Sequence, residues 1–182
     1  MVQAYEAGMR DFGENYVQEA LVKQQSVELL PEANWHLIGS LQSNKIRQVV
    51  GRFGLLHGVT SLEMAKKISG CCVSLSIVQP ILFEVQLDPL KHGLEPSQLS
   101  DTVKSAADLK GIEVLGIMGI PPLGNDAESS RPYFKKLFQL FNQLDLQHRK
   151  VLSMGMSGDF EVAITEGATH VRVGTAIFGQ RS

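Results

Sequence analysis

Short apolar runs alternate with amphipathic stretches along the whole chain. Each run is brief, rich in Val, Ile and Leu, and bounded by glycine or polar residues, a pattern typical of buried strands. The runs predict seven strands, at Arg10–Gly13, Trp35–Gly39, Leu55–Val59, Ile81–Leu87, Val114–Ile120, Val151–Gly155 and Val171–Gly174.

The stretches between these runs have helical periodicity. The clearest is Ser130–Leu144, where Phe134, Leu137, Phe138 and Phe141 follow the spacing i, i+3, i+4, i+7. The other predicted helices are Tyr16–Leu29, one capped by Ser43 that carries Ile46, Val49 and Val50, Leu62–Ile68, Ser97–Leu109 and Asp159–Glu166.

This alternation predicts an α/β fold with a parallel sheet and right-handed crossovers. Two architectures fit, a doubly wound open sheet and a closed (β/α)₈ barrel of the TIM type. The short strands ending in glycine or polar loops favour the barrel, although the pattern supplies seven strands where a barrel has eight. We expect one domain over residues 1–182, with the first strand of the barrel absent.

Composition excludes several classes of protein. The 19 acidic and 17 basic residues leave a formal charge of −2, whereas nucleic-acid-binding domains are strongly basic. No apolar run is long enough to span a membrane, and the N-terminus does not resemble a signal peptide. The two cysteines, Cys71 and Cys72, are adjacent and poorly placed to bridge each other. We therefore expect a cytoplasmic protein that binds neither nucleic acid nor membrane.

The loops after the last two predicted strands carry the strongest sign of chemistry. Ser157 and Gly158 precede a helix, and Gly174 and Thr175 follow the last strand. Bare backbone amides at such a turn attract anions, and barrels commonly bind phosphate at their last two loops. The alternative for Ser157 is an ordinary helix cap.

Arg172 belongs to the same region. Strand alternation places Val171 and Val173 on one side and Arg172 on the other, so that Arg172 points into the barrel mouth if the valines pack on helices. A buried guanidinium needs an anion or a good acceptor. A structural carboxylate partner is the alternative.

Other polar residues give weaker signals. His36 and His57 lie within predicted strands and could line the mouth, but strand histidines are more often core or rim residues. The sequence has no metal-ligand spacing, nucleophile elbow or P-loop.

Five segments together resemble the pyridoxal phosphate homeostasis protein family. They are DFGENYVQEA (Asp11–Ala20), WHLIGSLQSNK (Trp35–Lys45), GIMGIPP (Gly116–Pro122), LSMGMSGDFEVAI (Leu152–Ile164) and VRVGTAIFG (Val171–Gly179). The resemblance covers the chain from end to end. It implies a barrel like the N-terminal domain of alanine racemase that binds pyridoxal 5′-phosphate (PLP) and acts as a vitamin B6 carrier or regulator without established catalysis.

The resemblance also implies roles for individual residues. Ser157, Gly174 and Thr175 would hold the phosphate, and the backbone amides of Ser157 and Gly158 would contribute. Arg172 would face the pyridine nitrogen, and Asn15 would lie beside the ring. A full-length member is expected to be a monomer, and its protein partners are not indicated.

In the family, PLP forms an aldimine with a lysine on the first strand. Met1–Ala7 resembles the end of the helix that follows that strand, so we expect the aldimine lysine upstream of residue 1. Lys45, in the loop after the second predicted strand, is the nearest substitute in this chain, but it does not occupy an inward position at a strand end.

Two other functions remain open. A fold-related PLP-dependent racemase or decarboxylase would normally carry a second, β-rich domain, for which the chain has no room after its last strand. A barrel that binds another phosphorylated metabolite through the same loops is the third possibility.

Overall fold

The computed structural model describes residues 1–26, 30 and 32–180. Within these residues, seven parallel strands form one sheet in the order β1-β2-β3-β4-β5-β6-β7, so each strand pairs with the next in the chain. The strands are β1 (Asp11–Glu14), β2 (Asn34–Leu37), β3 (Leu55–Val59), β4 (Gln79–Val85), β5 (Ile112–Gly119), β6 (Val151–Met156) and β7 (His170–Arg172). All seven predicted strands are confirmed, with small shifts at their ends.

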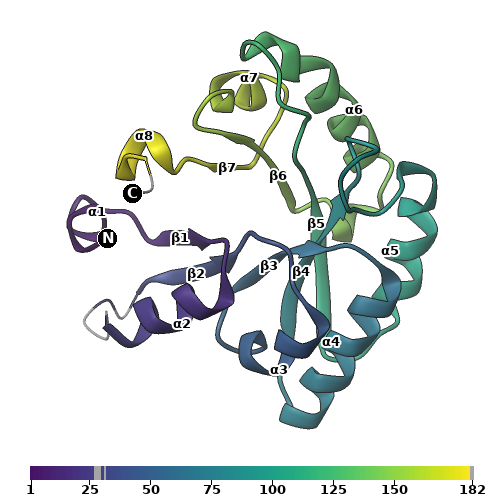
Figure 1. Ribbon diagram of the computed structural model, residues 1–182. Coiled ribbons are helices and arrows are strands. Elements are labelled where there is room, and N and C mark those ends of the chain that lie inside the picture. The colour runs from purple at the N-terminus through teal and green to yellow at the C-terminus, as the bar shows by residue number, and fades with distance from the viewer. Residues whose placement is uncertain (27–29, 31, 181–182) are drawn as a thin grey trace.

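Helices connect consecutive strands and cover the outside of the curled sheet (Figure 1). They are α1 (Val2–Glu6), α2 (Val17–Ser26), α3 (Ile46–Val49), α4 (Leu62–Leu75), α5 (Leu99–Ala107), α6 (Arg131–Asn142), α7 (Phe160–Thr165) and α8 (Thr175–Phe178), with 3₁₀ turns η1 (Ser43–Lys45), η2 (Pro96–Gln98), η3 (Glu128–Ser130) and η4 (Leu146–His148). Residues 27–29 of the predicted helix Tyr16–Leu29 lie outside the described residues. None of the described helices is long and apolar enough to cross a membrane.

One predicted helix boundary is wrong. The helix expected over Leu62–Ile68 continues through Gly70 to Leu75 and ends at Ser76, which adopts a left-handed conformation with φ of 56°. A Cβ at Gly70 would meet no atom within 4 Å, so no close packing accounts for this glycine. Ser69, which is polar but buried, donates its hydroxyl to the Lys110 carbonyl. The helix therefore continues through the Ser69–Gly70 pair without a break.

The two faces of the sheet have different cores. The main core, between strands and helices, includes the fully buried side chains of Phe83, Phe134 and Leu137. A smaller cluster of Leu55, Leu82, Met118 and Val151 packs separately. His57 follows Leu55 by two residues on β3 and so shares its face of the sheet. This apolar layer therefore fills the base of the barrel interior and leaves polar groups above it.

The barrel is nearly closed. Strands β1 and β7 end the sheet order and, within the described part of the chain, do not pair with each other. Figure 1 shows these strands, with both chain termini, at the open side of the curled sheet. The successive strand order and the outer layer of helices establish a partial (β/α)₈-type barrel rather than a doubly wound sheet.

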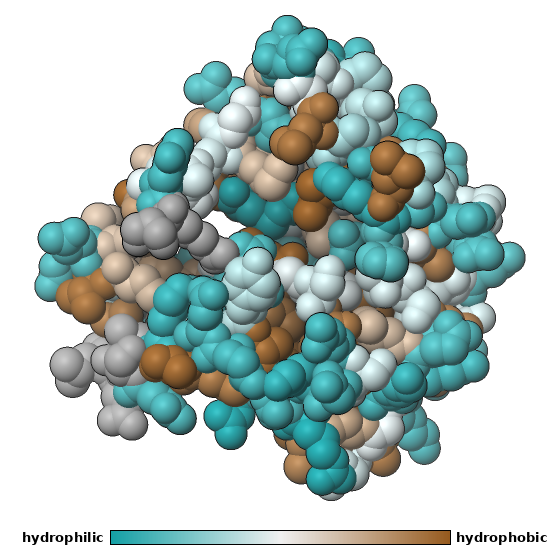
Figure 2. All heavy atoms as spheres, in the orientation of Figure 1, coloured by the Kyte–Doolittle hydropathy of each residue, from teal (hydrophilic) through white to brown (hydrophobic). Residues whose placement is uncertain are grey.

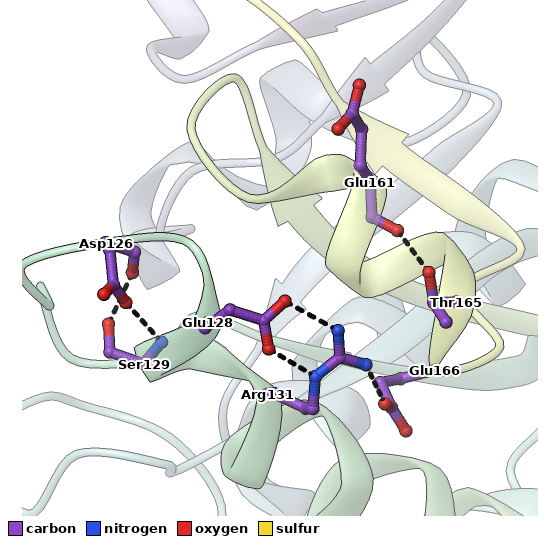
Figure 3. A network of polar contacts seen from close by, with 7 residues as sticks. All are labelled: Asp126, Glu128, Ser129, Arg131, Glu161, Thr165 and Glu166. Atoms are coloured by element: carbon purple, nitrogen blue, oxygen red, sulfur yellow. Dashed lines mark hydrogen bonds and ion pairs between the residues drawn. The ribbon is translucent and has the colours of Figure 1, made fainter.

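Arg131 joins α6 to α7 (Figure 3). Its guanidinium pairs with Glu128 at 2.6 Å and with Glu166, at the end of α7. These charge-assisted bonds raise the pKa of Arg131 above its ordinary value. They hold the beginning of α6 against α7, the helix that follows the β6 loop.

The open edges predict self-association of this chain. The unpaired backbone groups of β1 and β7 are available to another strand, so we expect oligomers that increase with protein concentration and a broad thermal transition. Light scattering after size-exclusion chromatography and a thermal melt measure both. A monomer at every concentration that melts sharply would contradict this prediction.

Candidate functional site

The barrel interior opens into a cavity of about 1010 Å³, a volume at the upper end of small-ligand sites. All six residues predicted for the binding site line it: Asn15, Ser157, Gly158, Arg172, Gly174 and Thr175. Figure 2 shows the molecule hollowed in the region that lies between β7 and β2 in Figure 1. The structure thus brings together residues that are far apart in sequence.

The loops after β6 and β7 meet at the Ser157 hydroxyl. Its oxygen accepts hydrogen bonds from the amide of Gly174 at 3.1 Å and from the amide of Ala176 at 3.4 Å. Two backbone amides on the second loop therefore converge on one oxygen atom of the first. This geometry suits an oxygen of an anion such as phosphate.

The glycines of these loops are not required by the fold. A Cβ at Gly158 or Gly174 would meet no atom within 4 Å, and neither residue has a positive φ. Gly155, at the end of β6, is different because its φ is +90° and a Cβ would lie 2.5 Å from the Ala163 Cβ. The open space at Gly158 and Gly174 is space that a phosphate group can occupy.

Asp159 fixes the shape of the first loop. One of its carboxylate oxygens accepts the Met156 amide at 2.7 Å, and the other accepts the Ser130 hydroxyl at 2.8 Å. Ser130 precedes α6, so this carboxylate ties the loop to a neighbouring helix. The amides of the loop are held in place before any ligand arrives.

Arg172 points into the barrel, as strand alternation predicts. Its Nη1 donates to the Ser153 hydroxyl at 2.7 Å and its Nη2 donates to the Gly119 carbonyl at 3.1 Å. Burial lowers its pKa to about 10, against the opposing charges of Glu84 and Asp159. The alternative of a structural carboxylate partner is not seen, since none of the ion pairs between described residues involves Arg172. Two hydrogen bonds use only part of its five donors.

A buried pair of histidines, His36 and His57, adjoins Arg172 and lines the cavity. The sequence allowed both to line the mouth but favoured positions in the core or at the rim. His36 Nδ1 lies 3.0 Å from His57 Nε2, and His57 Nδ1 lies 3.0 Å from the Ser153 hydroxyl. Burial lowers the pKa of His36 and, more strongly, that of His57, so both rings are neutral at pH 7. The signal in the sequence was the inward parity that these histidines share with Arg172.

One lysine at the cavity was also missed. Lys23, on α2, is the only lysine among the described residues that line the cavity. Its ammonium lies 2.7 and 2.9 Å from the two carboxylate oxygens of the buried Glu14. Lys45 lies in η1 and is not among the lining residues.

Comparison with known proteins places this chain in a family. The family described as "Alanine racemase, N-terminal domain" matches residues 1–182. The pyridoxal phosphate homeostasis protein of Aquifex aeolicus is 41% identical over 182 residues, which cover 97% of this chain and 79% of the relative. The protein of that name from Homo sapiens is 36% identical, over all of this chain and 72% of the relative. This chain belongs to the pyridoxal phosphate homeostasis protein family.

Solved structures agree with the family. PipY of Synechococcus elongatus PCC7942, a structure described as having PLP bound, is 39% identical with a TM-score of 0.88 and covers 97% of this chain and 85% of that one. An alanine racemase of Bartonella henselae shares only 21% identity at a TM-score of 0.76, which shows a common fold alone. The predicted fold of the alanine racemase N-terminal domain type is confirmed.

Proposed function

We propose that this protein binds PLP and serves in intracellular PLP homeostasis as a cytoplasmic carrier or regulator rather than as an enzyme. The observation that carries the proposal is the pair of loops at Ser157–Gly158 and Gly174–Thr175 beside an inward arginine in one cavity. The PLP-bound structure of PipY supports it.

In this site the two loops would bind the phosphate. The amides of Gly174 and Ala176 already converge on the Ser157 hydroxyl oxygen, which a phosphate oxygen would replace as their acceptor, and Gly158 leaves room for the group to approach the backbone. Thr175 adds a hydroxyl beside them, and Asn15 lines the cavity next to the ring position. The neutral amides stabilise negative charge without a lysine or a metal ion.

Arg172 would meet the opposite end of the ligand and donate a hydrogen bond to the pyridine nitrogen. PLP supplies an electrophilic aldehyde and a ring that withdraws electrons most strongly when its nitrogen is protonated. A guanidinium can only donate, so it holds that nitrogen unprotonated. This arrangement suits storage of the cofactor better than carbanion chemistry, which favours a carrier over a racemase or decarboxylase.

The phosphate loops can be tested with the ligand and with inorganic phosphate. We expect Gly174→Ala to leave the free energy of unfolding nearly unchanged, because its Cβ meets no atom within 4 Å, and to weaken both ligands about 10-fold by filling anion space. Isothermal titration calorimetry and urea unfolding measure the two effects.

The matched control is Gly70→Ala, since Gly70 has equally open surroundings in α4 and is far from the loops in sequence. Unchanged affinity for both ligands in Gly174→Ala would count against the phosphate assignment. It would leave binding of another metabolite elsewhere in the cavity as the better explanation.

The surroundings of the lysines predict that chain 1–182 binds PLP without a covalent bond. Lys23 would have to give up its ion pair with Glu14 and its proton before its amine could attack an aldehyde. We therefore expect that borohydride treatment of the PLP-loaded protein leaves its intact mass unchanged. A stoichiometric phosphopyridoxyl adduct at Lys23 or Lys45 would contradict this expectation.

A further inference from the structure

A continuous chain of hydrogen-bonding groups runs along the inside of the barrel from the exposed Asp11 to Arg172. It begins at the Asp11 carboxylate, whose side chain is 65% exposed and which lies 3.1 Å from His36 Nε2. It continues from His36 to His57 at 3.0 Å and from His57 to the Ser153 hydroxyl at 3.0 Å. It ends where Arg172 donates to Ser153 at 2.7 Å. The chain connects residues of β1, β2, β3, β6 and β7.

The chemistry of the two ends sets the direction of this chain. Arg172 can only donate and an ionised Asp11 can only accept. Each neutral histidine has one donor and one acceptor nitrogen. All four bonds form when Ser153 donates to His57 Nδ1, His57 Nε2 donates to His36 Nδ1, and His36 Nε2 donates to Asp11.

The reverse direction would break the contact with the carboxylate. His36 Nε2 would then accept from the Asn34 amide, 2.9 Å away, and would present a lone pair to Asp11. The second hydrogen of the Asn34 amide would still reach Asp11 Oδ1, 2.8 Å away. The reverse direction thus exchanges the bond from His36 to Asp11 for one from Asn34 to His36, and the bond to an ionised carboxylate is the stronger of the two. The ionised carboxylate therefore favours the direction from Arg172 to Asp11.

This direction determines what Ser153 presents to the guanidinium. Because the Ser153 hydroxyl donates its hydrogen bond to His57, its lone pairs face Arg172 Nη1. The Gly119 carbonyl holds Nη2 in the same way. The guanidinium plane is thereby fixed from two sides, and its remaining donors keep one orientation.

We propose that Ser153, His57 and His36 are positioning residues that aim Arg172 at a ring acceptor of the bound ligand and so make the site selective for a pyridine ring. The inference rests on the proposed function, in which Arg172 meets the ring nitrogen. None of the three is assigned contact with the ring. Their effect reaches the ligand through the guanidinium.

Two ligands separate this role from simple support of the fold. PLP offers a ring nitrogen, whereas its 1-deaza analogue has a C–H group in that place and the same phosphate. The wild-type chain should prefer PLP by about 10- to 150-fold, the range for a hydrogen bond to a charged donor. Ser153→Ala should reduce this preference about 10-fold by weakening PLP alone, because the loss of one orienting bond frees the guanidinium.

The matched control is Ser69→Ala. Ser69 is buried like Ser153, and its hydroxyl donates to the backbone carbonyl of Lys110. It lies on α4 and does not line the cavity. It should leave the preference unchanged. Equal weakening of both ligands by Ser153→Ala would overturn the inference in favour of a structural role, and an unchanged preference would overturn it as well. A wild-type chain without preference would instead reject the placement of Arg172 at the ring nitrogen.

Nitrogen-15 NMR of the histidine rings tests the chain of bonds without any ligand. We expect both rings to be neutral, with the proton on Nε2 of His36 and of His57. Asp11→Ala removes an exposed carboxylate and should shift the protons of both rings to Nδ1, since Asn34 then becomes the partner of His36 Nε2 and His57 Nε2 must accept from His36 Nδ1. Protons on Nδ1 of both rings in the wild type, or no shift in the variant, would refute the direction on which the inference depends.

Discussion

Arg172→Ala is expected to weaken PLP binding about 10- to 150-fold, the cost of a hydrogen bond from a charged donor. Fluorescence titration with PLP measures this loss. The PLP affinity of the conservative variant Arg172→Lys should fall between those of the wild type and Arg172→Ala. One ammonium group cannot reproduce a planar guanidinium that reaches both Ser153 and Gly119. Arg52→Ala, which removes an exposed arginine, is the control and should bind normally.

The opposite result would separate ligand binding from structure. If Arg172→Ala bound PLP as tightly as the wild type but unfolded at lower urea concentration, Arg172 would be a structural tie between β7 and β5. The two bonds that it makes to other parts of the barrel would then be its whole role.

Gly155→Ala is expected to reduce the free energy of unfolding by about 2–5 kcal/mol. The new Cβ would lie 2.5 Å from the Ala163 Cβ and 3.1 Å from the Phe160 Cα, at a φ of +90°. A left-handed conformation costs about 1–2 kcal/mol for a residue with a side chain, and overpacking adds about 1–3 kcal/mol. Urea unfolding followed by circular dichroism gives the value.

Gly158→Ala is the matched control for this measurement. It lies three residues further along the chain, with a φ outside the left-handed region and no atom within 4 Å of a Cβ. It should unfold like the wild type. Equal stability of the two variants would show that the close contact between β6 and α7 relaxes at little cost.

The strands were predictable because a buried parallel strand leaves a compact apolar run with a glycine or polar stop. Leu55–Val59 was placed at the bounds that the structure shows. The end of α4 was not predictable, because serine and glycine are both unfavourable inside a helix. In the structure the Ser69 hydroxyl has a hydrogen-bond acceptor and Gly70 lies in open space, so neither residue ends the helix. A local pattern cannot report a partner such as Lys110, 41 residues away.

The meeting of the loops after β6 and β7 at one cavity was predictable from their place at consecutive strand ends, and the histidine network was not. Ser157, Gly174 and Arg172 lie within a short stretch whose glycines and parity carry the signal. The His57–Ser153 contact joins residues 96 positions apart, and only the curvature of the barrel brings them within hydrogen-bonding distance. Lys23 was missed because it reaches the cavity from a helix rather than from a strand end.

The open space at Gly158 and Gly174 has a consequence for how the protein can change through evolution. Packing in the main core involves Phe83, Phe134 and Leu137, whereas a Cβ at either loop glycine would touch nothing. Mutations in these loops can therefore accumulate with little loss of stability. A population of such sequences would vary the lining of this cavity on an unchanged barrel, whereas Gly155, beside the loops, is a position where the fold resists substitution.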